Sequence, residues 1–90
     1  MQTARYTLTP TPIRVDVSPD DSIAFRDLTV IAQEAGTLVA CEDAASFATG
    51  ARIPVTAGQA VTFDRIQGNE AVWLAAAADL DVDVIETGVA

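Results

Sequence analysis

Three aspartates at alternate positions, Asp79, Asp81 and Asp83 in ADLDVDV, come nearest to the spacing of a metal site. Carboxylates at positions one, three and five open an EF-hand calcium loop, which also needs Gly at position six and Glu at position twelve. Those two positions hold Val84 and Ala90. The same alternation is typical of the solvent face of a strand, where charges discourage edge-to-edge pairing. We therefore expect a solvated strand face, with no metal site and no cofactor.

Other catalytic chemistry has few residues to work with. The chain has no His and no Lys, so Ser-His-Asp and Cys-His arrangements and Schiff-base chemistry are excluded. No glycine-rich phosphate loop is present. The single cysteine, Cys41, cannot form an internal disulfide and is expected to be a small buried residue. A domain of this size also offers little room for a pocket of a few hundred cubic ångströms. We expect a protein that is not an enzyme.

Charge and length exclude further classes. The net charge of the 90 residues is −8 and the pI is about 4.1, which argues against binding phosphate backbones or anionic membranes. No run of apolar residues is long enough to span a bilayer, and the N-terminus lacks the pattern of a signal peptide. We expect one domain, made in the cytoplasm, with no nucleic-acid or membrane partner.

Period-two alternation of apolar and polar residues predicts short β-strands separated by turns. The predicted strands are Ala4–Leu8, Ile13–Val17, Ile23–Gln33 with a bend at Arg26–Asp27, Thr37–Cys41, Arg52–Val55, Ala60–Ile66, Ala71–Ala76 and Leu80–Glu86. The stretch from Glu42 to Ala51 is expected to be a loop with at most one helical turn. About eight strands at this spacing predict an all-β fold, a small antiparallel β-sandwich or jelly-roll-like domain. We expect residues 52–90 to form an antiparallel meander.

The apolar positions of these strands predict the core. Its expected members are Tyr6, Leu8, Ile13, Val15, Val17, Ile23, Phe25, Leu28, Val30, Leu38, Ala40, Ile53, Val61, Phe63, Val72, Leu74, Val82 and Val84. Trp73 is out of phase with Val72 and Leu74. Its ring is expected either to pack under a loop of its own chain or to anchor a subunit contact, a role in which Trp is enriched.

Residues 1–12 are set apart from the domain at 13–90, because Thr9-Pro10-Thr11-Pro12 interrupts the first predicted strand. They form either an edge strand followed by a kink or an extended arm that reaches a neighbouring subunit. The candidate partner-binding residues are Gln2, Arg5, Tyr6, Leu8, Pro10, Pro12 and, from the other end of the chain, Trp73.

From Gly50 to Glu86 the sequence has a recognisable order of features: a loop, a short strand, the turn TAGQAVTF, the strand AVWLAAAA and a closing strand VDVIE. It resembles the small β-sandwich virion proteins of tailed bacteriophages and gene transfer agents, and it extends over Ile23 to Gly88. No functional residue is carried over with this pattern. The resemblance implies a structural role, such as that of a capsid decoration (cement) protein or a head-fibre base.

From this resemblance we expect a decoration protein that binds the outer capsid surface of a virion as a small homo-oligomer, with a trimer favoured. Its partner would be the major capsid protein, whose subunit junctions it would stabilise by covering apolar area. One alternative is a tail, neck or head-fibre component of the particle. Another is an acidic inhibitor that binds a basic host protein, which would give strongly salt-dependent binding.

Overall fold

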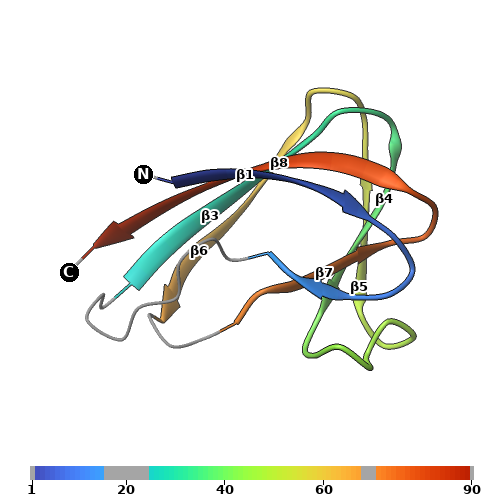
Figure 1. Cartoon of the computed structure of the whole chain (residues 1–90), viewed down its shortest axis with the longest axis horizontal. Helices are drawn as coiled ribbons and strands as arrows, with labels where there is room; N and C mark the ends of the chain where they lie inside the picture. The colour runs from blue at the N-terminus through green and yellow to red at the C-terminus, as the bar shows by residue number, and fades with distance from the viewer. Residues whose placement is uncertain (1, 16–24, 68–70, 90) are drawn as a thin grey trace.

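The computed structural model describes residues 2–15, 25–67 and 71–89, and in these ranges the ordered elements are all β-strands (Figure 1). They are β1 (Gln2–Leu8), β2 (Ile13–Arg14), β3 (Phe25–Ala32), β4 (Gly36–Cys41), β5 (Ala51–Val55), β6 (Ala60–Gln67), β7 (Trp73–Ala76) and β8 (Leu80–Val89). The strands form two four-stranded antiparallel sheets. The predicted all-β sandwich of about eight strands is confirmed.

Sheet A has the order β1-β8-β3-β6 and sheet B the order β2-β7-β4-β5. The pairs β1·β8, β2·β7, β3·β6 and β4·β5 are nested, so the chain is a long hairpin rolled into two layers, which is the jelly-roll arrangement. The predicted meander of residues 52–90 is wrong: β5, β6, β7 and β8 lie alternately in sheets B and A. Alternation along a strand indicates which face is buried, but it does not indicate which strand is the neighbour.

The hydrophobic core fills the space between the sheets. Its buried members are Leu8, Val15, Leu28, Val30, Ala32, Leu38, Val55, Ile66, Leu74, Ala76, Leu80, Val82 and Val84. Seven predicted core residues are only partly buried and pack against this cluster: Tyr6, Ile13, Ala40, Ile53, Val61, Phe63 and Val72. Val17, Ile23 and the side chain of Phe25 lie outside the part of the chain that is described. The buried residues that the pattern missed, such as Ala32 and Leu80, stand at strand ends.

A second buried layer lies on the outer face of sheet B. Val39 and Ala75 are cross-strand neighbours with 0% exposure, yet they alternate with the core residues Leu38 and Ala76 and so point away from the core. Residues 42–50 form turns as predicted, and Gly50 at their end lies against Val39, whose cross-strand neighbour Arg52 donates to Phe47 of the same loop. Gly50 lies so close to Val39 that a Cβ atom there would stand 2.6 Å from Val39 Cγ1.

The loop at residues 42–50 is held by Arg52 of β5. Its Nη1 donates to the carbonyl oxygens of Phe47 (2.6 Å) and Gly50 (2.8 Å). Its guanidinium also lies 4.7 Å from the centre of the Phe47 ring, a cation–π distance. At the start of the loop, the Ser46 hydroxyl accepts from the backbone N–H groups of Glu42 and Asp43. These local bonds give a nine-residue connection one defined position over sheet B.

Candidate functional site

Of the four sheet edges, three carry features that hinder pairing with another strand. Strand β2 has two residues and follows the buried Pro12, and β5 contains Pro54, which has no N–H to donate. In β6 the register with β3 shifts between Arg26 and Leu28, so that two β6 residues stand opposite one on β3. Bulges and prolines of this kind are the usual protection of an edge.

Strand β1 is the unprotected edge. Its seven residues pair in unbroken register with β8, from Gln2 opposite Glu86 to Leu8 opposite Leu80, and it contains no proline. Among the strands formed by residues 2–15, 25–67 and 71–89, none pairs with its other side in sheet A. A strand in this position offers backbone donors and acceptors to an incoming strand.

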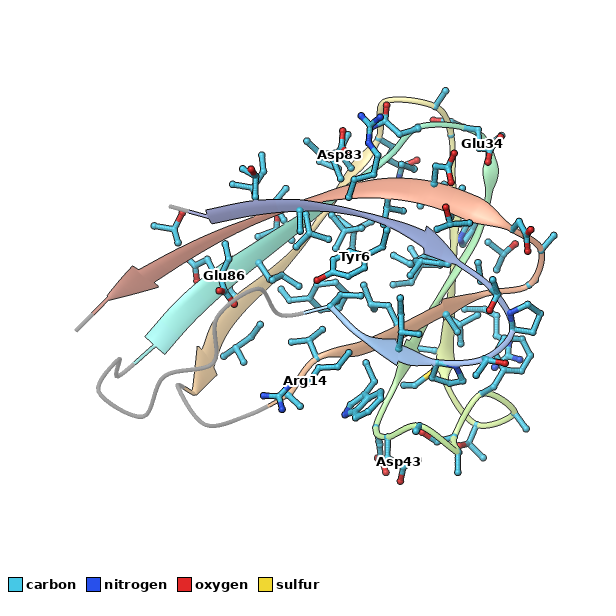
Figure 2. All side chains as sticks on the ribbon, viewed as in Figure 1. Tyr6, Arg14, Glu34, Asp43, Asp83 and Glu86 are labelled. Atoms are coloured by element: carbon cyan, nitrogen blue, oxygen red, sulfur yellow. The ribbon has the colours of Figure 1, made fainter. Side chains whose placement is uncertain are left out.

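The seven predicted partner-binding residues do not share one surface. Arg5 is exposed on β1, and Gln2 begins the same strand. Tyr6 is half-buried and points inward, as Figure 2 shows, while Leu8 is fully buried in the core. Exposed Pro10 and buried Pro12 follow in the connection to β2, and Trp73 lies on sheet B. Of these seven residues, Arg5 therefore presents an exposed side chain on β1, and this side chain is bonded to Asp83.

The outer face of sheet A is a network of polar cross-strand bonds. Arg5 Nε and Nη2 donate to the two carboxylate oxygens of Asp83, at 2.7 and 3.1 Å. Gln33 Nε2 donates to Asp83 Oδ2 at 2.9 Å, and Thr7 Oγ1 donates to Asp81 Oδ1 at 2.6 Å. The hydrogen bond from Arg5 lowers the pKa of Asp83. These bonds tie β1 to β8, and they tie β8 to the residue that follows β3.

Asp81 and Asp83 thus lie on the outer face of β8, and the exposed Asp79 lies just before this strand. Within residues 2–15, 25–67 and 71–89, no three His, Cys, Asp or Glu side chains come together as a metal site. In the same ranges no helix is long and apolar enough to cross a membrane.

The second feature is an apolar hollow of about 280 Å³, here called the Trp73 groove. Its lining includes Ala40, Cys41, Phe63, Val72 and Trp73, with Glu42 at the rim. Phe63 and Ile66 come from β6 of sheet A, and the other lining residues come from sheet B or the segments beside it, so the groove is lined by both layers. A second hollow of about 390 Å³ lies over Arg5, Ile31 and Ile85 on sheet A.

The expectation of little room for such hollows is wrong. Both are open at the surface, and neither needs an enclosed cavity inside the small core.

Trp73 is half-buried and has Cys41 and Arg14 as its cross-strand neighbours. Trp73 lines the groove, whereas Ala75, two residues further along β7, is fully buried. Burial raises the pKa of the Cys41 thiol, with the Arg52 charge acting in the opposite direction. The thiol is therefore an uncharged part of the groove at neutral pH.

Sequence reasoning selected Trp73 and missed the rest of this groove. Phe63 and Val72 have the alternation of core residues, yet both are only partly buried: Phe63 lies on the edge strand β6, and Val72 lies just before β7. No local signal distinguishes such a residue from a fully buried one, because exposure depends on how far the opposite sheet extends.

No protein-family model and no curated protein matches the sequence. Among solved structures, a de novo designed double-stranded β-helix is similar over 97% of this chain and 100% of its own, with a TM-score of 0.56 and 13% identity. A chain of Bacillus endospore appendages, which are disulfide-linked pili, is similar over 99% of this chain and 85% of its own. Its TM-score is 0.50 and its identity 14%. At these identities the likeness shows the fold alone.

Proposed function

We propose that this chain is a non-catalytic structural subunit that joins a larger assembly through the β1 edge. The observation that carries the proposal is the contrast between edges: β2, β5 and β6 are obstructed, whereas β1 presents seven residues without proline or register shift. Addition of a strand from a neighbouring protein to such an edge provides main-chain hydrogen bonds and a defined orientation.

The most concrete form of this role is a capsid decoration protein on the outer surface of a phage-like particle. Support comes from the likeness of residues 23–88 to small virion proteins of tailed phages and gene transfer agents. The fold shared with a chain of spore-appendage pili is compatible with a part in assembly. In this proposal a small homo-oligomer, for which we favour a trimer, binds the major capsid protein and stabilises its junctions by burying surface.

The acidic surface suits such a role. A net charge of −8 keeps single copies soluble before assembly and favours partners with basic surfaces. The bonds of Arg5 and Thr7 to β8 hold β1 in its extended form, so the edge is ordered before a partner arrives. A preordered strand loses less conformational entropy on binding than a flexible arm would.

The deciding measurement is the copy number of this protein in purified particles, by quantitative mass spectrometry against the major capsid protein. Hundreds of copies are expected for a shell-wide decoration protein. A few to some tens would place it in the tail, neck or a head fibre. Its absence from particles would refute both roles and favour an inhibitor of a basic host protein.

The contact edge is tested separately by hydrogen–deuterium exchange of the free and particle-bound protein. Deletion of residues 1–11 would be a poor test, because Leu8 is fully buried in the core and its loss would disturb folding. Amides of β1 that exchange in the free protein should become protected on binding. Equal exchange of β1 in the two states, with protection confined to other strands, would refute the edge contact.

A further inference from the structure

The Trp73 groove is an exposed apolar surface that the β1 contact does not use. Its walls are the half-buried side chains of Phe63, Val72 and Trp73, and its floor includes the buried Leu74 and Ile66. Phe63 of sheet A and Trp73 of sheet B thus both line one open hollow. Concave apolar surfaces with an aromatic side chain are the usual receptors for a large side chain of a partner.

The charges around the groove indicate what kind of partner fits. In sheet B the strand order β2-β7-β4 puts Arg14 on one side of Trp73 and Cys41, followed by Glu42, on the other. Glu42 is exposed at the rim, and its neighbour Asp43 points into solvent at the same end of the sheet (Figure 2). Two adjacent carboxylates thus flank the β4 side of the groove.

Arg52, on the strand beside β4, is already engaged by its own loop. Arg52 donates to two loop carbonyl groups and stacks on Phe47. The neutral Cys41 thiol adds no charge to the groove, and the chain as a whole carries −8. A positive group brought to Glu42 is therefore attracted both locally and by the field of the whole molecule.

We infer that the Trp73 groove is a docking site for a basic, apolar segment of another protein. A large aliphatic or aromatic side chain of that segment enters the hollow that Phe63, Val72 and Trp73 line, and an adjacent Arg or Lys pairs with Glu42. This inference does not rest on the proposed function. The β1 edge lies in sheet A, and most of the groove lies in sheet B, so either contact can exist without the other.

The chain contains a single Trp, so its fluorescence reports directly on the groove. The probe is an acetylated and amidated heptapeptide of alternating leucine and arginine, titrated into the full-length protein. Two control peptides carry glutamate in place of arginine or serine in place of leucine. We expect a blue shift of the Trp73 emission with the leucine–arginine peptide, weakened by added salt, and little change with either control.

Matched variants locate the contact. Glu42→Gln should weaken binding of the leucine–arginine peptide roughly two- to fivefold, as expected for one exposed ion pair. Asp79→Asn removes the same charge from an exposed residue beyond the far end of β7 and should leave the affinity unchanged. NMR shifts of the backbone amides of Phe63 and Val72 should follow the same titration.

Three results would overturn the inference. The first is no emission change up to the solubility limit of the peptide. The second is a control peptide that binds as tightly as the leucine–arginine peptide, or an Asp79→Asn variant that weakens binding as much as Glu42→Gln. Either result shows that binding does not depend on the apolar hollow and on Glu42. The third is a concentration-dependent dimer of the protein in sedimentation that competes with the peptide, which would show that a second copy occupies the groove.

Discussion

Gly50 is the position where a single methyl group should disturb this fold most clearly. A Cβ atom at residue 50 would lie 2.6 Å from Val39 Cγ1, 2.8 Å from the Ala40 carbonyl oxygen and 3.1 Å from Cys41 Sγ. Val39 is fully buried, and the Ala40 carbonyl belongs to β4, which is held between β5 and β7. Gly50→Ala therefore forces either the loop at residues 42–50 or strand β4 to move.

The size of the effect follows from this geometry. Inserting a methyl group into packed surroundings costs about 1–3 kcal/mol. For a domain of 60–100 residues, each kcal/mol lowers the melting temperature by roughly 4–8 °C, so we expect a fall of about 5–20 °C. The cost is steric, because Gly50 is not in the left-handed region, unlike Gly58 with φ 82°.

Two other glycines are the controls. Gly58→Ala meets no atom within 4 Å, so its cost should be only the roughly 1–2 kcal/mol of a left-handed conformation. Gly36→Ala meets Cδ1 of the buried Leu80 at 3.2 Å, a milder approach than the 2.6 Å at residue 50, so its cost should be smaller than that of Gly50→Ala. In a double-mutant cycle, Val39→Ala should recover part of the Gly50→Ala loss but not all of it, since the Ala40 carbonyl remains.

Thermal and urea unfolding followed by circular dichroism measure these free energies, provided that the two transitions coincide. A Gly50→Ala variant within 0.5 kcal/mol of the wild type (a difference typical of surface substitutions) would refute the packing of residues 42–50 on sheet B. Full recovery by Val39→Ala would instead show that the Ala40 carbonyl is not a barrier.

The remaining predictions concern the hydrophobic core, the loss of stability at acidic pH and the reactivity of the Cys41 thiol. Leu74→Ala, at a fully buried side chain, should lower the free energy of unfolding by about 2–5 kcal/mol in urea titrations, and a loss below 1 kcal/mol would contradict the core assignment. The bond from Arg5 lowers the pKa of Asp83 in the folded protein. The Arg5–Asp83 pair therefore stabilises the fold fully at pH values above the unfolded-state pKa of Asp83, and this stabilisation is lost as the pH falls through its folded-state pKa. Urea titrations from pH 7 to about 3 should therefore show Asp83→Asn less stable at neutral pH and converging with the wild type in acid, whereas parallel curves would exclude the pair. Since burial raises the pKa of Cys41, its reaction with a disulfide reagent at pH 8 should be slower than that of free cysteine, and a faster reaction would contradict the described surroundings.

Much of the local structure follows from the sequence by itself. Alternation in LDVDV places Val82 and Val84 inside and Asp81 and Asp83 outside, and the structure agrees. The bend predicted at Arg26–Asp27 coincides with the register shift of β3 against β6, and the predicted turn at residues 56–59 contains the positive-φ Gly58. These features depend on neighbours within a few residues, which the sequence displays directly.

The pairing of the strands was decided only in three dimensions. Residues 52–90 read as a meander, yet each successive strand crosses to the other sheet and finds partners far away in sequence, such as β1 for β8. The same topology leaves β1 at an edge, places Gly50 against the buried Val39, and puts Phe63 and Trp73 in the lining of one hollow. The alternation of side chains along a strand has the same period whichever strand pairs with it. A free sheet edge, a buried outer face and a groove between the two sheets are therefore defined only by the tertiary structure.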